Sequence, residues 1–245
     1  MNLRHLITGA AVLVILTGCV TTSTRTHPTL EEELLKVNTV VIAPPRVEIE
    51  FKKLMGENNR LEYQEEAIRA QLMTIARGEL LHHGFEVIEF DFDDAIKNDV
   101  EFAESVSQVR AGFDKAREEL QLGKHLSEEE AKAIRASLGE AVNIVASESG
   151  ADAILLMRYS GWDKSGGHVA KDIGISLLVA VLTSGMVMAS FPTEGAMTEA
   201  ALIDGTTGEV LWADIKGGAL DAVVADVTMD SMPHDVDPGQ EPPEQ

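Results

Sequence analysis

The chain has 245 residues, of which 44% are hydrophobic and 25% are charged, as in a folded protein rather than a disordered one. Its formal net charge of −21 repels nucleic acid phosphates and anionic lipid headgroups, so we exclude a protein that tracks a nucleic acid backbone. The single cysteine, Cys19, excludes an internal disulfide and a zinc site built from paired cysteines.

Residues 1–18 have the parts of a secretory signal peptide. Arg4 supplies a positive charge, and the apolar run LITGAAVLVILTG follows at residues 6–18. This run has the length of a signal-peptide core and is too short for a comfortable membrane span. We therefore predict that residues 1–18 are removed from the mature protein.

The four residues Leu16, Thr17, Gly18 and Cys19 resemble the lipobox of bacterial lipoproteins at every position. The resemblance implies cleavage between Gly18 and Cys19, with a diacylglycerol on the cysteine sulfur and further fatty acyl chains such as palmitate. Each buried lipid CH₂ contributes about 0.8 kcal/mol, so several chains anchor the protein firmly. An ordinary signal peptide with a chance cysteine is the alternative interpretation.

The residue after the cysteine bears on the destination of the protein. Enterobacterial lipoproteins that stay at the inner membrane carry an aspartate there, whereas this chain has Val20. By that resemblance we expect the outer membrane, with the folded part facing the periplasm. We interpret residues 19–36, which are polar, rich in threonine and broken by Pro28, as the lipidated cysteine and a flexible tether.

A single folded domain is predicted over residues 37–228. Short apolar runs predict strands at residues 37–42, 47–51, 85–90 and 153–162, with the first ended by Pro44 and Pro45. The segment TEAALIDGTTGEVLWADI at residues 198–215 predicts a β-hairpin, in which Gly205 and Gly208 are free to take positive φ.

Residues 61–84 predict an amphipathic helix that ends at Gly84. His82 and His83 lie in its last turn, where imidazoles complement the helix dipole, and we prefer this interpretation to a metal site. The acidic segment after the next strand, residues 91–99, starts like a calcium loop but lacks the required glycine and distal glutamate. We predict a solvated loop there, and no metal or cofactor anywhere in the chain.

Residues 101–149 predict a helical hairpin inserted in the domain. Hydrophobic residues of the first arm recur at intervals of 4 and 3 residues: Phe102, Val106, Val109, Phe113, Ala116 and Leu120. Those of the second arm recur at intervals of 3 and 4 residues: Ala131, Ile134, Leu138, Ala141 and Val145. The two rows pack either on each other or on the sheet.

Residues 173–191 carry no charge and are long enough to cross a bilayer as a helix. We consider a buried core helix, a surface that meets a partner subunit or the membrane, and a true span, against which the glycine and serine content argues. The candidate partner or membrane contacts in this stretch are Leu177, Leu178, Val181 and Leu182. A last amphipathic helix is predicted at residues 220–229, and an acidic, proline-rich disordered tail at residues 229–245.

The order of these elements, and above all GFEVIEF after a helix and DGTTGEVLW, resembles periplasmic lipoproteins related to the amino-terminal domain of TolB and to the secretion lipoprotein CsgG. The resemblance covers residues 37–228. It implies an α/β (α+β) fold: a small mixed sheet of about four to five strands packed by helices. Long alternating insertions that would form barrel hairpins in CsgG are missing, which puts a secretion pore in doubt.

No motif of a serine hydrolase, a zinc protease or a phosphate-binding loop occurs in the sequence. We therefore predict a non-catalytic binding or assembly module of the cell envelope, held at the membrane by Cys19, whose partner is an envelope protein or a second copy of the chain. One alternative is a component of an outer-membrane secretion or transport assembly that uses residues 173–191 for oligomer or membrane contact. Another is a membrane-tethered enzyme without a recognisable motif.

Overall fold

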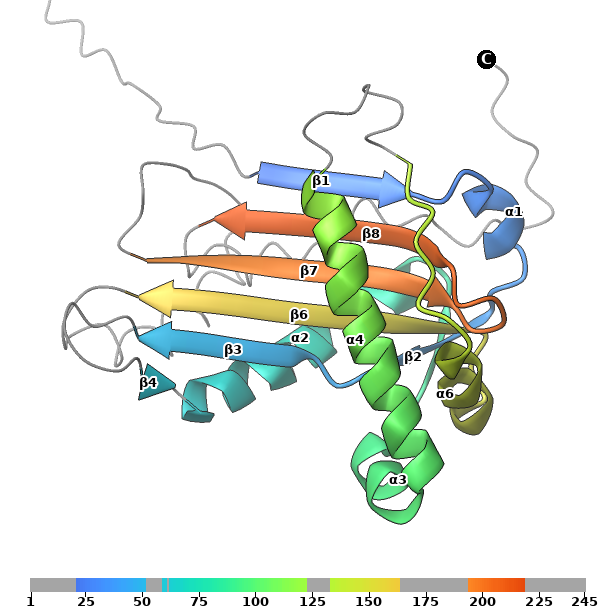
Figure 1. Cartoon of the computed structure of the whole chain (residues 1–245), viewed down its shortest axis with the longest axis horizontal. Coiled ribbons are helices and arrows are strands. Elements are labelled where there is room, and N and C mark those ends of the chain that lie inside the picture. The colour runs from blue at the N-terminus through green and yellow to red at the C-terminus, as the bar shows by residue number, and fades with distance from the viewer. Residues whose placement is uncertain (1–20, 52–58, 61, 123–132, 164–193, 219–245) are drawn as a thin grey trace, which may run out of the picture.

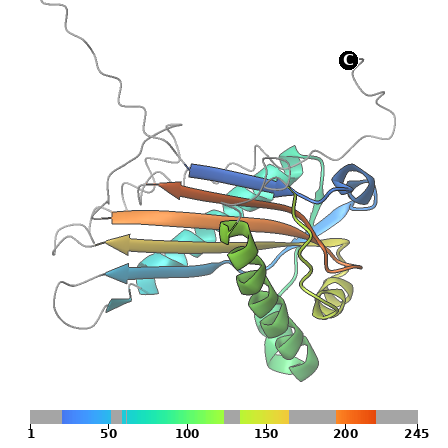
Figure 2. The ribbon, with the colours of Figure 1, turned by 45° about the horizontal axis from the view of Figure 1, so that its top comes forward.

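The computed structural model describes residues 21–51, 59–60, 62–122, 133–163 and 194–218. Within them, eight strands form one mixed sheet with helices on both faces (Figures 1 and 2). The strands are β1 (Thr21–Thr26), β2 (Thr39–Ile42), β3 (Arg46–Phe51), β4 (Asn59–Arg60), β5 (Glu86–Ile88), β6 (Ala153–Asp163), β7 (Glu194–Asp204) and β8 (Val210–Gly218). The helices are α1 (Leu30–Leu34), α2 (Glu62–His82), α3 (Phe92–Asn98), α4 (Val100–Leu122) and α6 (Ala141–Ser149). The predicted α/β class is confirmed, but the predicted number of strands was too low.

Strand β6 is the centre of this sheet. β7 pairs with it antiparallel along its full length, from Ala153 opposite Asp204 to Asp163 opposite Glu194. β2 and then β3 pair with the other side of β6, both parallel. β8 and β1 continue the sheet beyond β7 in antiparallel order, and β5 lies parallel to β2 on the other side.

The two prolines after β2 end that strand, as the sequence predicted, and β3 then continues the pairing with β6. Ile42 pairs with Leu155 and Arg46 pairs with Arg158, so four steps along one chain match three along β6. The extra residue is accommodated as a bulge, at which proline's missing N–H leaves no ladder bond unmade. The carbonyl of Pro45 accepts a hydrogen bond of 3.2 Å from Nε of Arg69 on α2.

Each face of the sheet has its own hydrophobic core. On one face α2 buries Ile68, Leu72 and Leu80 against strand residues that include Leu155 and Trp212. The helix ends as predicted, since Gly84 takes a φ of 96°.

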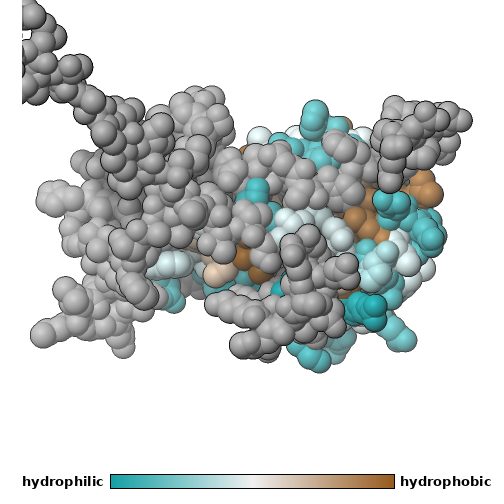
Figure 3. Space-filling model, turned by 90° about the horizontal axis from the view of Figure 1, so that it is seen from above, coloured by the Kyte–Doolittle hydropathy of each residue, from teal (hydrophilic) through white to brown (hydrophobic). Residues whose placement is uncertain are grey.

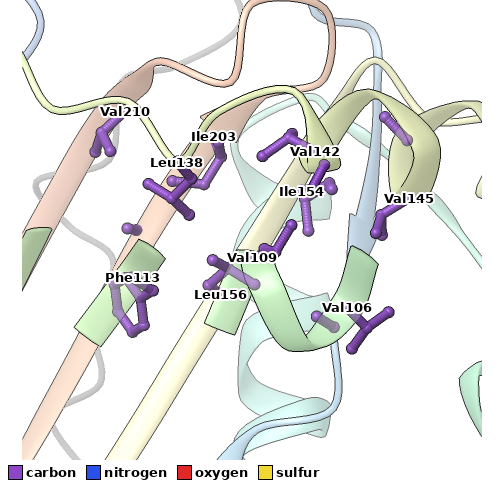
Figure 4. Packing of buried hydrophobic residues seen from close by; sticks show 14 of the residues in the cluster. Val106, Val109, Phe113, Leu138, Val142, Val145, Ile154, Leu156, Ile203 and Val210 are labelled. Carbon is purple, nitrogen blue, oxygen red and sulfur yellow. The ribbon is translucent and has the colours of Figure 1, made fainter. Parts of the chain in front are cut away.

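The other face is covered by α3, α4 and α6. The predicted row on α4 is buried from Phe102 to Ala116. It packs on the sheet and on α6, as Figure 4 shows for Val106, Val109 and Phe113 beside Ile154 and Leu156. The prediction of a helix for the first arm of the hairpin is therefore confirmed, and its hydrophobic row packs on the sheet and on α6.

The prediction of a helix for the second arm of the hairpin was wrong at residues 133–138, which are extended rather than helical. The helical part, α6, begins only at Ala141. Ser137 forms a bridge with Glu209, and Ala133 forms one with Thr26. Ile134, Ala136 and Leu138 are buried while the residues between them are not, which is the two-residue period of a strand. The helical spacing that we used coincides with this period at Ile134 and Leu138.

The predicted flexible tether was also wrong over its described residues. Residues 21–26 form β1, which pairs with β8 from Thr21 opposite Gly217 to Thr26 opposite Trp212. Threonine is polar but β-branched, and it therefore favours a strand at the edge of a sheet. α1 follows, with Leu34 fully buried, so the folded domain begins well before residue 37.

The acidic segment that we predicted as a solvated loop contains α3. A carboxylate oxygen of Asp91 accepts a hydrogen bond of 2.9 Å from the backbone N–H of Asp94 and caps the helix. Asp93 and Asp94 lie in the first turn, where carboxylates complement the helix dipole. Phe92 is buried and attaches the helix to the core.

Several predictions lie outside the described residues: the signal peptide at 1–18, the uncharged stretch at 173–191, the helix at 220–229 and the tail at 229–245. Within the part of the chain that the structure describes, no helix combines the length and the apolar character needed to cross a membrane.

The turn between β7 and β8 is held by Asp204. One of its carboxylate oxygens accepts hydrogen bonds from the backbone N–H groups of Thr206 (2.8 Å) and Thr207 (2.6 Å). Gly208 takes a φ of 71°, as predicted. Gly205 does not adopt positive φ; it is needed because a Cβ there would lie 2.5 Å from the carbonyl oxygen of Asp152.

We predict that Gly208→Val destabilises the domain by about 1–3 kcal/mol, because a β-branched residue is strained at positive φ. A Cβ at this position would also lie 2.5 Å from the carbonyl oxygen of Gly139. Thermal unfolding followed by circular dichroism measures the effect, with the exposed Thr206→Ala as the matched control. Similar melting temperatures for the two variants would contradict the turn geometry.

Candidate functional site

A group of charged side chains lies between α4 and the sheet. Strand pairing places Arg46 beside Arg158, and Arg158 opposite Glu199, in one row across β3, β6 and β7. Side chains alternate along a strand, so Arg158 lies on the face opposite the buried Met157 and Tyr159. Helix α4 crosses this row and contributes charges of its own.

Two arginines and two carboxylates form the first part of the group. Arg158 donates to Asp114 through Nη1 (2.9 Å) and to Glu48 through Nη2 (2.8 Å). Arg46 makes the same two pairs, at 2.9 Å to Asp114 and 2.8 Å to Glu48. Each carboxylate therefore bridges two guanidinium groups, and the helix is tied to both strands.

Arg117 and Glu199 complete the group. Arg117 on α4 donates through Nε to Glu199 on β7 at 2.5 Å, and its Nη1 lies 3.7 Å from Asp114. The side chain of Glu199 is only 4% exposed, so its charge is largely removed from water. We call Arg46, Glu48, Asp114, Arg117, Arg158 and Glu199 the α4 network. Its charges balance three against three.

The arginines of the α4 network lower the pKa of Glu48. Partial burial by itself would raise the pKa of Glu48, but the hydrogen bond from Arg46 and the charges of Arg158 and Arg46 outweigh it and lower the pKa. Nearby, loss of water and then the guanidinium groups of Arg46 and Arg69 lower the pKa of Arg110. A carboxylate with a lowered pKa is a weak base at neutral pH.

A small hollow opens beside the network. Its lining is shared by the β2–β3 bulge, α4 and β6: Ala43, Pro44, Arg46, Arg110, Phe113, Asp114, Leu156, Met157 and Arg158. Its volume of about 20 Å³ has room for one water molecule and not for an organic ligand. The ion pairs of the α4 network thus fasten α4 to β3, β6 and β7.

The site residues predicted from the sequence are not part of this network. Gly18, Cys19, Leu177, Leu178, Val181 and Leu182 all lie outside the described residues. His82 and His83 do lie at the end of α2, with their rings edge to face and 5.8 Å between centroids. Among the described residues, no three histidine, cysteine, aspartate or glutamate side chains are grouped as a metal site requires.

Our sequence interpretation missed the α4 network. A signal was present, because Arg158 lies between Met157 and Tyr159, and Glu199 directly precedes an apolar run that begins at Ala200. A charge in such a run faces the core on one side of the sheet and needs a partner there. The identity of those partners depends on strand register and on where α4 crosses, neither of which is visible in the sequence.

The described surface shows no broad apolar area. Its exposed large hydrophobic side chains are Leu35, Leu81 and Val100, on three different elements or their ends. Figure 3, which looks onto the β1 side, shows hydrophobic residues only as small areas among hydrophilic ones.

No family model matches the chain, and no curated protein matches it either. Among solved structures, lipoprotein GNA1162 from Neisseria meningitidis is similar over 74% of this chain and 80% of its own, at 11% identity and a TM-score of 0.30. The PelC dodecamer from Paraburkholderia phytofirmans matches over 86% and 94%, at 10% identity and a TM-score of 0.33. The LpoB C-terminal domain from Salmonella enterica matches over 79% and 96%, at 14% identity and a TM-score of 0.26. TM-scores this low fall short of a shared fold, so none of the three likenesses supports a conclusion about this chain.

The lowered pKa of Glu48 predicts a pH-dependent contribution to stability. A glutamate whose pKa is lower in the folded state stabilises the fold above its unfolded pKa of about 4.3, and this is lost as the pH falls through the folded value. Glu48→Gln should therefore destabilise the domain by about 1–3 kcal/mol near neutral pH, and by less in acid. Urea unfolding between about pH 7 and about pH 3 measures the difference. The exposed Glu31→Gln is the control, and a Glu48→Gln effect that does not change with pH would contradict the prediction.

The buried end of the network predicts strong coupling between Arg117 and Glu199. Arg117→Met leaves a carboxylate in the core without its closest guanidinium, at a cost of about 3–5 kcal/mol. Adding Glu199→Gln removes that charge, so the double variant should be more stable than the sum of the single effects indicates. Urea unfolding of all three variants measures the coupling. The exposed pair of Arg77 and Glu89 is the control, with coupling below about 1 kcal/mol; additive effects at Arg117 and Glu199 would refute the role of the pair.

Proposed function

We propose that the chain is a lipid-anchored lipoprotein of the outer membrane whose α/β domain acts in the periplasm as a non-catalytic binding or assembly module. The observation that carries the proposal is the tetrapeptide LTGC at residues 16–19, after a charged start and an apolar core. The membrane is contacted through lipid on Cys19. An envelope protein or a second copy of the chain is the expected further partner.

The structure supports this proposal through the position of β1. The strand starts at Thr21, with one residue, Val20, between it and the cysteine. An acylated Cys19 would thus hold the sheet directly at the membrane surface, without the long tether expected from the sequence. Such a connection suits a rigid module that presents one fixed side to its partners.

The chemistry of the described residues supports a non-catalytic role. In the α4 network every carboxylate is paired with a guanidinium, and the pKa of Glu48 is lowered, away from the range of a general base at neutral pH. The adjoining hollow is too small for a substrate.

Residues 173–191 favour a second candidate function. The stretch connects β6 to β7, carries no charge and contains Leu177, Leu178, Val181 and Leu182. A segment of this kind suits a component of a secretion or transport assembly, in which it would contact other subunits or the membrane. A variant without the lipid, such as Cys19→Ser, would separate any membrane attachment through this stretch from attachment through the lipid.

We predict that Cys19→Ser abolishes incorporation of labelled palmitate and leaves the signal peptide uncleaved or the protein released, because the acyl chains supply the membrane affinity. Metabolic labelling and fractionation of the envelope measure both effects. The control is Val20→Ile, which keeps the lipobox intact. A serine variant that still fractionates with the outer membrane would contradict the anchor, and would favour residues 173–191 as the attachment.

A further inference from the structure

One end of the sheet brings together chain segments that are far apart in the sequence. Thr21, the first residue of β1, pairs with Gly217 of β8, and Gly217 pairs with Met197 of β7. On the next strand Trp162 pairs with Gly195. We call this end, formed by Thr21, Trp162, Gly195 and Gly217, the anchor end; it lies on the left in Figure 1.

Chain length ties the anchor end to the proposed lipid. Two residue steps separate Cys19 from Thr21, and an extended chain covers at most about 3.6 Å per residue. The α-carbon of Cys19 therefore lies within about 7 Å of that of Thr21. A bilayer that holds acyl chains on Cys19 must come close to this end of the domain.

The acidic helix α1 lies far from the anchor end. Figure 1 shows α1 and α6 at the opposite end of the sheet, where α1 carries Glu31, Glu32 and Glu33 in its first turn. The anchor end has carboxylates as well, because the last pair of β6 and β7 is Asp163 opposite Glu194. Chain length rather than charge therefore selects the side of the domain that meets the lipid.

The anchor end also presents a residue type suited to a membrane surface. Trp162 is half-buried, and its ring lies over Gly195, where a Cβ would come within 2.5 Å of it. Tryptophan is enriched at the level of lipid headgroups, since its ring is apolar and its N–H is polar. Thr21, Gly195 and Gly217 carry no charge, whereas the pair next to Trp162 and Gly195 is Asp163 opposite Glu194.

We propose that the anchor end faces the bilayer, with the strands of the sheet directed at the membrane and with α1 and α6 farthest from it. The partner of this surface is a phospholipid bilayer. The inference rests on the lipid anchor proposed above and adds the side of the domain that the anchor brings to the membrane. Partners in the periplasm would then meet the end that carries α1 and α6.

The chain carries its own probes for this orientation, because it has two tryptophans at different heights. Trp162 lies at the anchor end, whereas Trp212 is 1% exposed and pairs with Leu202, seven positions along β7 from Gly195. That separation corresponds to about 23 Å along the strand. Quenching by a nitroxide on lipid headgroups, which acts at short range, therefore distinguishes the two.

The experiment uses the mature lipidated protein in vesicles of phosphatidylethanolamine and phosphatidylglycerol, with and without headgroup-nitroxide lipid. Trp162→Phe leaves only Trp212, and the difference between wild type and Trp162→Phe gives the signal of Trp162. This design avoids substitution of the buried Trp212. We expect Trp162 to lose more than half of its fluorescence in the nitroxide vesicles, while Trp212 loses little.

Quenching of Trp212 equal to or greater than that of Trp162, in protein that floats with the vesicles, would overturn the orientation and leave the anchor intact. Protein that fails to float with the vesicles would overturn the anchor and, with it, the orientation. Strong quenching of Trp162 alone would support both.

Discussion

Every other part of the described fold depends on the pairing of β6. This strand is bonded along its full length to β7, and on its other side to β2 and then β3. Both of its faces are covered, by α2 on one side and by α4 and α6 on the other. Its one arginine, Arg158, faces α4, and burying that charge requires carboxylates from β3 and from the helix. The position of α4 is therefore set by its buried apolar row together with the ion pairs that it makes with Arg158 and its neighbours.

This constraint bears directly on function. The charged groups between α4 and the sheet pair with one another and tie the helix to β3, β6 and β7, which supports the non-catalytic role that we propose. In the proposed arrangement one residue, Val20, would join the lipidated Cys19 to β1, which would fix the domain in orientation as well as in place. In the proposed function, the domain acts by holding a binding surface at a fixed distance from the membrane.

Elements with a single strong period could be predicted from the sequence. The α2 helix, the α4 row and the β7–β8 hairpin follow from apolar spacing and turn residues that permit one interpretation. The errors have definite physical causes. Thr21–Thr26 has no apolar period because an edge strand buries little, and Ile134 and Leu138 fit both a helix and a strand. Pairings such as that of Arg117 with Glu199 depend on register across distant segments, which local patterns do not encode.

The proposed attachment of the domain to the membrane depends on one covalent event, the acylation of Cys19. Mass spectrometry of the N-terminal peptide of the mature protein, purified from membranes in detergent, tests it most directly. The account predicts a peptide that begins at Cys19 and carries the mass of a diacylglyceryl group, with the cysteine thiol blocked. A peptide that begins at Met1 or at any residue other than Cys19, or that carries a free thiol, would contradict it.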